Sequence, residues 1–294
     1  MKGKGSSLIL ILVFFTGLSL MLYPTVSNWY NSTHQGRVIV DYTQQVDQLR
    51  QEEHDRLLRE AEAYNAALSE RSSFTALSGE ENAVYRAMLL PAENSAMAYV
   101  EIPAIGCTLP IRHGTEESVL DRSVGHLEWS SLPVGGAGTH CVISGHRGLP
   151  SSELFTNLDR LAVGDTFKIH VLGKTLDYRV DHIATVEPLD YSLLGIEEGK
   201  DYVTLVTCTP YGINSHRLLV RGVRAEPAGS LSASAQIAVT NEAEMIKLTY
   251  LVPVTLLVLA GAIFVLLLAD SGRPVRKKGG RRLEEKQARR RKGF

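Results

Sequence analysis

The sequence predicts a mainly β fold, a barrel or a sandwich, over residues 97–226. From about residue 97 the chain consists of short runs of β-branched and aromatic residues, separated by Gly, Pro, Asp and Asn. Such runs are typical of strands, and little helical periodicity lies between them. We expect about eight strands, over residues 99–102, 108–112, 139–144, 166–172, 175–180, 183–187, 202–208 and 217–224.

Two apolar segments without charged residues flank this region and predict membrane anchors. Residues 248–269 match the roughly 20 residues that cross a hydrocarbon core as a helix. Residues 7–23 are shorter and follow Lys2 and Lys4. Because no small-x-small cleavage site comes after them, we expect an uncleaved signal anchor rather than a signal peptide that is removed.

The net charge of −1 hides a strong asymmetry along the chain. Residues 271–294 contain eleven Lys or Arg and two Asp or Glu, whereas the rest of the chain has a net charge of −10. Positive charge beside both apolar segments predicts a two-pass protein of the cell membrane, with cytoplasmic termini and residues 31–247 outside. The basic tail then lies beside anionic lipid. The acidic remainder argues against a nucleic-acid binder.

Between the first anchor and the β domain, residues 39–72 contain no Pro and repeat apolar residues at near-helical spacing. We expect one or two juxtamembrane helices that pack on the β domain. The predicted organisation is a cytoplasmic stub with the signal anchor, a helical region, the β domain, a linker, a transmembrane helix and a basic cytoplasmic tail. Their boundaries are 1–30, 31–96, 97–226, 227–247, 248–269 and 270–294.

The residues with the clearest chemical potential lie at predicted strand ends. Cys208 ends one strand and Arg217 begins the next, so a hairpin through residues 209–216 would bring both to the same end. His146 follows the strand 139–144 and opens a loop bounded by Gly and Pro. A cysteine nucleophile needs such a base or cation, because the thiolate attacks. By themselves these residues also fit a buried cysteine and a turn histidine.

Other residues compete for these roles. His216 neighbours Arg217, but adjacent residues of a strand point to opposite faces, so His146 is preferred as the partner of Cys208. His140 lies beside Cys141, yet no C-x-x-C or H-x-x-x-H array accompanies them, and a structural histidine is favoured over a metal site. With three cysteines at least one thiol is free; we expect Cys107 and Cys141 to be reduced and structural.

Four longer strings resemble the sortase family of Gram-positive transpeptidases. TLVTC at 204–208, an Arg nine residues after the Cys, and an upstream GHRG at 145–148 are similar to sortases in general. The resemblance extends over roughly residues 85–225 and is to class C, the pilus-assembling subgroup. Its strings are IPAIGCTLPIRHG (102–114), GHLEWSSLPVGG (125–136), SGHRGLPSSELFTNLDRL (144–161) and TLVTCTPYGINSHRLLVRG (204–222).

The resemblance implies an eight-stranded sortase-type β-barrel with short helices, preceded by the helical region and flanked by the two membrane-spanning segments. It assigns the nucleophile to Cys208, the proton donor for the leaving amine to His146, and the group that holds the substrate or oxyanion to Arg217. Thr207, before the nucleophile, is assigned to substrate binding. No metal or cofactor is implied. The substrate would be a Leu-Pro-x-Thr-Gly-like sorting signal, and the partners would be pilin subunits with that signal and an acceptor lysine.

One feature of the subgroup is missing. Class C sortases commonly carry an Asp-Pro-aromatic motif in a lid over the active site, but this chain has no Asp between Asp55 and Asp121. Phe74 or residues 78–82 remain as candidates to cover the cleft, without the acidic partner for the arginine. We therefore expect the exposed domain to be at least partly open.

Three further functions compete with pilin polymerisation. They are a housekeeping sortase that attaches proteins to cell-wall precursor, a hydrolase in which water replaces the amine, and a non-catalytic module that binds sorting signals. Two anchors and the long class C strings argue against the housekeeping role. A papain-like protease is disfavoured, since it would place its Cys on a helix ahead of its His.

Overall fold

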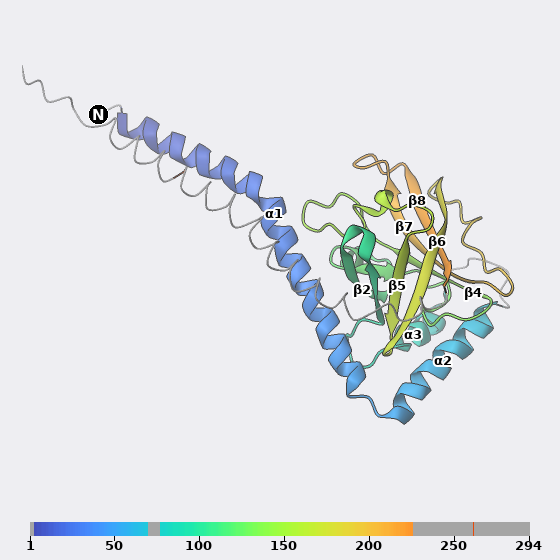
Figure 1. Ribbon diagram of the computed structural model, residues 1–294. Coiled ribbons are helices and arrows are strands. Elements are labelled where there is room, and N and C mark those ends of the chain that lie inside the picture. The colour runs from blue at the N-terminus through green and yellow to red at the C-terminus, as the bar shows by residue number, and fades with distance from the viewer. Residues whose placement is uncertain (1–2, 70–76, 226–260, 262–294) are drawn as a thin grey trace, which may run out of the picture. The chain divides into compact units, whose positions relative to one another are not determined.

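The computed structural model describes residues 3–69, 77–225 and 261. In this part of the chain eight strands close into a barrel in the order β1-β2-β3-β4-β7-β8-β6-β5 (Figure 1). The strands are β1 (Ala98–Ile102), β2 (Cys107–His113), β3 (Val124–His126), β4 (Thr139–Ser144), β5 (Thr166–Val171), β6 (Lys174–Val186), β7 (Asp201–Thr209) and β8 (His216–Arg224). The chain divides into two compact units, and the barrel lies in the unit Leu20–Leu231.

The predicted mainly β fold is confirmed, and most strand positions agree to within a residue or two. The segments expected at 175–180 and 183–187 are one long strand, β6, whose register against β8 shifts between Val180 and His182. A bulge of this kind bends a strand without ending it. The three-residue strand β3 was not predicted, because Val-Gly-His is too short to show an alternating pattern.

The two faces of the central strands serve different purposes. Alternate residues such as Ile143 on β4, Leu205 on β7 and Val220 on β8 are buried in the main core. Their neighbours Val142, Val206 and Leu219 point to the opposite face and form a smaller apolar cluster with Leu194. Because side chains alternate along a strand, one apolar set fills the barrel and the other lies on its outer face. The outer cluster matters below, since it underlies the candidate site.

Four helices and two 3-10 turns accompany the barrel in the described residues. They are α1 (Gly3–Asp47), α2 (Gln51–Ser69), α3 (Gly79–Ala87) and α4 (Glu117–Leu120), together with the 3-10 turns η1 (Pro103–Ile105) and η2 (Leu158–Arg160). In Figure 1, α2 and α3 pack across one end of the barrel. The end of α1 and the whole of α2 agree with the one or two helices expected within 39–72, whereas α3 lies in the predicted helical region 31–96 but was not placed there as a separate helix. It begins at a capping box in which Ser78 and Glu81 bond each other's backbone N–H.

Side chains of the helical region belong to the barrel's core. Leu57 and Ala61 of α2 and Tyr85 of α3 are buried in the main cluster. At the end of α1 the Tyr42 hydroxyl donates to the carbonyl of Met97 and accepts from the N–H of Leu172. On α2 the Asn65 amide makes two hydrogen bonds to the backbone of Leu132, at 3.0 and 2.7 Å. The helices are thus built into the domain and do not act as a detached spacer.

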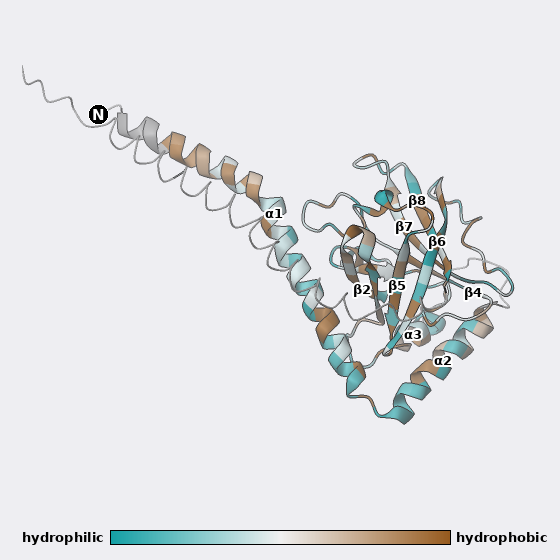
Figure 2. Ribbon diagram, in the orientation of Figure 1, coloured by the Kyte–Doolittle hydropathy of each residue, from teal (hydrophilic) through white to brown (hydrophobic). Residues whose placement is uncertain are grey.

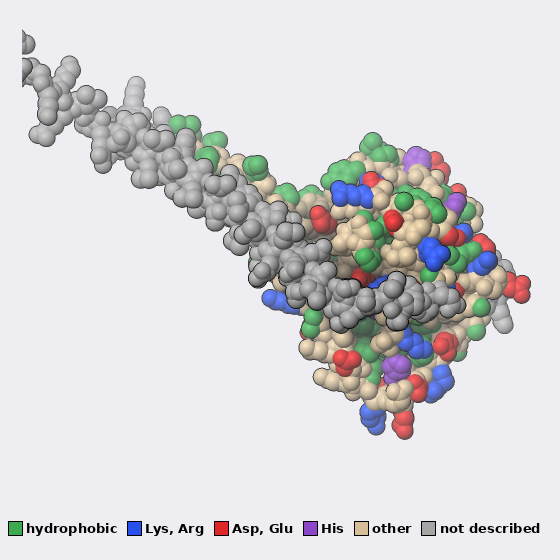
Figure 3. Space-filling view, viewed as in Figure 1, with side chains coloured by type: hydrophobic (Ala, Val, Ile, Leu, Met, Phe, Trp, Pro, Cys, Tyr) green, Lys and Arg blue, Asp and Glu red, His purple; other side chains and the backbone are tan. Residues whose placement is uncertain are grey.

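The first part of α1 is apolar and exposed. Brown residues follow one another along it in Figure 2, and apolar side chains lie along it in Figure 3. The helix is long and apolar enough to cross a membrane, which is consistent with anchoring through the predicted segment 7–23. The predicted linker 227–247, the second span 248–269 and the basic tail 270–294 lie outside the described residues apart from residue 261.

Candidate active site

Three adjacent strands bring His146, Cys208 and Arg217 to one edge of the barrel. Strands β4 and β7 are parallel, and Ser144 pairs with Val206. His146 and Cys208 each come two residues after this pair, so both lie just beyond it on the same face. Strand β8 runs antiparallel to β7 and pairs Arg217 with Cys208. The order β4-β7-β8 therefore aligns the three residues that the sequence singled out.

These residues line one cleft of about 300 Å³ on the outer face of the barrel. On β7 and β8 the lining residues alternate as one face requires, Val206 with Cys208 and Arg217 with Leu219, and Ser144, Gly145 and His146 follow one another at the end of β4. Its walls also include residues from the β6–β7 connection, among them Pro188, Asp190, Tyr191 and Leu194. The apolar cluster on the outer face forms much of its floor, so the cleft combines a thiol, an imidazole and a guanidinium with apolar surface.

Within the part of the chain that the structure describes, the guanidinium of Arg217 bonds only to backbone carbonyls. Its Nη1 donates to the carbonyls of Asn214 at 3.3 Å and His216 at 3.1 Å. Across residues 3–69 and 77–225 no carboxylate forms an ion pair with it. A cation that is held in place by carbonyl oxygens but not neutralised remains available to an anionic or carbonyl oxygen of a substrate.

His146 begins a loop that joins β4 to η2, and we call residues 145–157 the histidine loop. The loop closes on itself, because the N–H of Phe155 donates to the carbonyl of His146 at 3.1 Å. The N–H of Gly148 donates to the Thr156 hydroxyl at 3.1 Å. The buried Phe155 ring packs so closely on Gly145 that a Cβ there would come within 2.8 Å of it. Phe155 therefore holds the backbone at His146 in two ways, through its N–H and through the packing of its ring on Gly145.

Arg147 supports the site without lining the cleft, and the sequence did not single it out. Its Nη1 donates to the Thr209 hydroxyl at 3.1 Å and its Nη2 to the Asp159 carboxylate at 2.5 Å. The side chain is only 9% exposed. Arg147 directly follows His146 and bonds Thr209, which directly follows Cys208. Its side chain thus connects the two strand ends that carry His146 and Cys208. Arginine in a GHRG string looks like an exposed loop cation, and only the tertiary structure places it between the two strand ends.

Thr207, assigned to substrate binding by resemblance, lies on the face of β7 opposite to Cys208. It is 1% exposed, and its hydroxyl donates to the carbonyl of Gly145 at 2.8 Å. The hydroxyl therefore joins β7 to the start of the histidine loop. Any effect of Thr207 on a substrate would pass through Gly145 and the backbone next to His146.

The competing residues are engaged elsewhere. His216 pairs with Glu187 at 3.3 Å, and it is not among the residues that line the cleft. His140 is buried, with its ring nitrogens 2.8 Å from the carbonyl of Gly195 and 2.7 Å from the Thr204 hydroxyl. Burial also lowers the pKa of His140. These contacts agree with the structural role that the sequence favoured for His140.

The three thiols differ in their surroundings. All are free, which confirms the expectation that Cys107 and Cys141 are reduced. Burial raises the pKa of Cys107 to about 12 and that of Cys141 well above its ordinary value. Both thiols therefore stay protonated and poorly nucleophilic at neutral pH. Cys208 is the thiol that opens into the cleft with an imidazole and a guanidinium.

The segment that the sequence offered as a lid packs beside the cleft instead of lining it. Residues 78–82 begin α3, where the Asn82 amide donates to the Glu128 carboxylate at 2.8 Å. No residue of 3–69 or 77–114 is among those that line the cleft. Phe74, the other candidate, lies outside the described residues.

Comparison with known proteins identifies the fold. The model of the sortase domain matches residues 100–225. The structure of sortase C1 from Streptococcus agalactiae is 46% identical to the chain; the match covers 65% of this chain and 99% of that one, with a TM-score of 0.63. The chain belongs to the sortase family. The predicted sortase-type barrel is thereby confirmed.

Other strong structural matches of this sortase are also class C members. Sortase C from Streptococcus pneumoniae is 45% identical, with 66% of this chain and 100% of that one covered and a TM-score of 0.60. Sortase C from Clostridium perfringens is 42% identical, with 64% and 98% covered and a TM-score of 0.57. Membership of the family supports a cysteine transpeptidase, and the class C subtype is supported by these structural neighbours.

Proposed function

We propose that this sortase is a membrane-anchored transpeptidase that joins pilin subunits through a lysine side chain. The observation that carries the proposal is the shared cleft of Cys208, His146 and Arg217, in a chain whose structural neighbours are class C sortases. The pneumococcal neighbour is described in connection with pilin substrate specificity, and the clostridial one with the C-terminal cell wall sorting motif. These descriptions suggest the substrate class for this chain.

In the proposed acylation step the thiolate of Cys208 attacks the carbonyl carbon of the Thr–Gly amide in a Leu-Pro-x-Thr-Gly-like signal. A C–S bond forms and the carbonyl oxygen gains negative charge, which Arg217 stabilises with a charge-assisted hydrogen bond. The C–N bond then breaks as His146 gives a proton to the glycine nitrogen. The products are a thioester on Cys208 and a free amine.

In the proposed second step an uncharged lysine amine of another pilin attacks the thioester. An isopeptide bond forms, the C–S bond breaks, and the thiolate of Cys208 is restored. His146, neutral after the first step, accepts the proton that the amine loses, so each cycle returns the site to its starting protonation state. Neither step requires a cofactor.

The arrangement proposed in the cell is a two-pass membrane protein. Residues 1–30 and 248–269 would contain the anchors, with the helical region 31–96 and the catalytic barrel 97–226 outside. The linker 227–247 would lead to the second span, and the basic tail 270–294 would lie on the cytoplasmic side, as its charge suggests. The exposed first part of α1 supports the first of these anchors.

A competition between acceptor amines tests the proposal. The full chain in detergent is given a sorting-signal peptide together with a lysine-bearing pilin domain and a peptidoglycan-stem amine. We expect the isopeptide-linked pilin product as the main product, and none with Cys208→Ala. Exclusive use of the stem amine would contradict pilin polymerisation and favour attachment to cell-wall precursor. Unchanged product formation by Cys208→Ala would contradict the cysteine mechanism itself.

A further inference from the structure

The helix α1 contacts the histidine loop through a row of amide side chains. Asn28, Asn31 and Gln35 are three and four residues apart, so they share one face of the helix. They bond three successive loop residues: the Asn28 Oδ1 accepts from the N–H of Glu153 at 2.9 Å, the Asn31 Nδ2 donates to the carbonyl of Ser151 at 2.7 Å, and the Gln35 Nε2 donates to the Ser152 hydroxyl at 3.2 Å.

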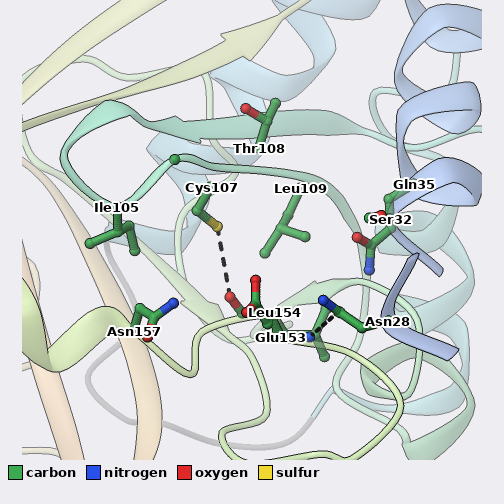
Figure 4. Close-up of a pocket in the computed structure, with 11 residues that line it drawn as sticks. Asn28, Ser32, Gln35, Ile105, Cys107, Thr108, Leu109, Glu153, Leu154 and Asn157 are labelled. Atoms are coloured by element: carbon green, nitrogen blue, oxygen red, sulfur yellow. Dashed lines mark hydrogen bonds between the residues drawn. The ribbon is translucent and has the colours of Figure 1, made fainter. Parts of the chain in front are cut away.

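These bonds link residues 151–153 to the helix, whereas Leu154 and Phe155 of the same loop are buried in the main core. A cavity of about 100 Å³ lies between α1, the loop and the start of β2. Figure 4 shows Asn28 bonded to Glu153 on one side of this cavity and the Cys107 thiol aimed at the Leu154 carbonyl on the other. Because space remains between the helix and residues 151–153, loss of the amide bonds would let these three residues shift relative to α1.

A short path leads from these contacts to the candidate active site. Glu153, which Asn28 holds, is two residues from Phe155, whose N–H donates to the carbonyl of His146. The Phe155 ring also packs on Gly145, directly before His146. A shift of residues 151–153 therefore moves the group that fixes His146. Loops of this length are otherwise among the mobile parts of a fold.

We propose that α1 is a positioning element of the catalytic site, which sets the place of His146 through Asn28, Asn31 and Gln35. The same helix begins with the segment that is apolar enough to span a membrane, so anchoring and active-site support are properties of one helix. The catalytic part of this inference rests on the proposed function. The mechanical part, that α1 restrains the histidine loop, does not.

Two Asn→Asp substitutions separate a specific hydrogen bond from general helix packing. Asn28 serves as an acceptor, so Asn28→Asp keeps its bond to the N–H of Glu153. Asn31 serves as a donor, so Asn31→Asp loses its bond and places an oxygen against the carbonyl of Ser151. The same Asn→Asp substitution on the same helix face is thus expected to keep the bond at position 28 and to break it at position 31. Gln35→Ala is matched by Gln44→Ala, an exposed glutamine further along α1.

The test uses the full chain in detergent micelles, with two readouts and a thermal unfolding midpoint for each variant. Hydrogen exchange of the Phe155 amide reports opening of the loop. The kcat and KM for transpeptidation report the position of His146. We expect Asn31→Asp and Gln35→Ala to speed exchange at Phe155 about ten-fold and to lower kcat about ten-fold, with KM changed less than about two-fold. Asn28→Asp and Gln44→Ala should match the original chain in both readouts.

The outcomes distinguish the inference from the proposed function. Unchanged exchange and unchanged kcat in Asn31→Asp and Gln35→Ala would overturn the inference while leaving the transpeptidase proposal intact. Equal losses in Asn28→Asp and Asn31→Asp would also overturn it, since helix packing would then explain the effect. If the original chain forms no transpeptidation product, the proposed function fails, and the exchange at Phe155 still decides whether α1 restrains the loop.

Discussion

Cys208 and Arg217 face each other as register partners across the β7–β8 hairpin. The pairing sets both side chains on the outer face of the barrel, where they line the same cleft as His146. Eight residues, 209–216, separate Cys208 from Arg217 along the chain. The antiparallel register alone brings a guanidinium beside the thiol.

We expect the role of Arg217 in stabilising the reacting oxygen to require its planar guanidinium and not its positive charge alone. Arg217→Lys keeps the charge but loses the planar fork of donors, so we expect kcat/KM for the sorting-signal peptide to fall about 100-fold. Arg179→Lys, at an exposed position of β6, is the matched control and should retain at least half of the activity. Activity of Arg217→Lys close to that of the original chain would show that the guanidinium does not stabilise the reacting oxygen.

Substitution of His146 and substitution of His216 should have very different effects on the rate of acylation. We expect His146→Gln to slow thioester formation by a factor of about 100 to 10,000, because the leaving amine then lacks its proton donor. His216→Gln should change the rate less than about three-fold, since His216 pairs with Glu187 away from the cleft lining. The measurement is the single-turnover rate of acylation by rapid quench. A larger loss with His216→Gln than with His146→Gln would reverse the assignment.

Arg147 should contribute to both stability and rate, since it joins the histidine loop to Thr209 and Asp159. Arg147→Lys cannot reach both partners with one planar group, and we expect a loss of about 1–3 kcal/mol in unfolding free energy together with about a ten-fold lower kcat. Arg160→Lys, an exposed neighbour on η2, is the control. Denaturant unfolding and steady-state assays check both effects. If Arg147→Lys left both the unfolding free energy and kcat unchanged, Arg147 would not support the site.

Acid should destabilise the domain through two buried histidines. Burial lowers the pKa of His113 to about 4 and that of His126 to about 3, and Tyr85 bonds the His126 ring. Below the ordinary histidine pKa of about 6.5 the unfolded chain binds protons that the folded chain does not, so stability falls as pH falls from about 6.5 towards 4. Each histidine adds a slope of up to about 1.4 kcal/mol per pH unit.

Denaturant unfolding between pH 7 and 4 measures this slope. His126→Gln should be less stable at pH 7 but should show a shallower loss of stability in acid, because one of the two proton-binding groups is removed. The same slope in His126→Gln and in the original chain would mean that other groups carry the acid sensitivity.

The sequence was sufficient for the barrel and for the pairing of Cys208 with Arg217 because both depend on local patterns. Alternating strands and their turns predicted seven of the strand segments in nearly the observed places, and Cys208 and Arg217 flank a hairpin whose geometry follows from its length. The partnership of His146 with Cys208 came from family resemblance. In the structure it depends on the parallel pairing of β4 with β7, which no local pattern specifies.

Other features could not be predicted because they depend on tertiary contacts. Strand β3 is too short for a periodic signal. Helix α3 differs, because its capping box, Ser78 with Glu81 three residues later, is a start signal that the sequence itself contains. Arg147 and Thr207 acquire their roles from groups far along the chain, Thr209 and Gly145 respectively. The amide row on α1 consists of three ordinary polar residues. Its role becomes visible only when the structure shows that these residues bond the histidine loop.

The most direct test of the account is mass spectrometry of the full chain after incubation with a Leu-Pro-x-Thr-Gly peptide. We predict a thioester adduct on Cys208, with the mass of the fragment that ends in Thr. It should be absent in Cys208→Ala, retained in Cys107→Ala, and discharged by a lysine amine. Absence of any adduct, with the Cys208 thiol readily alkylated under the same conditions, would contradict the assignment of Cys208 as a nucleophile towards this signal.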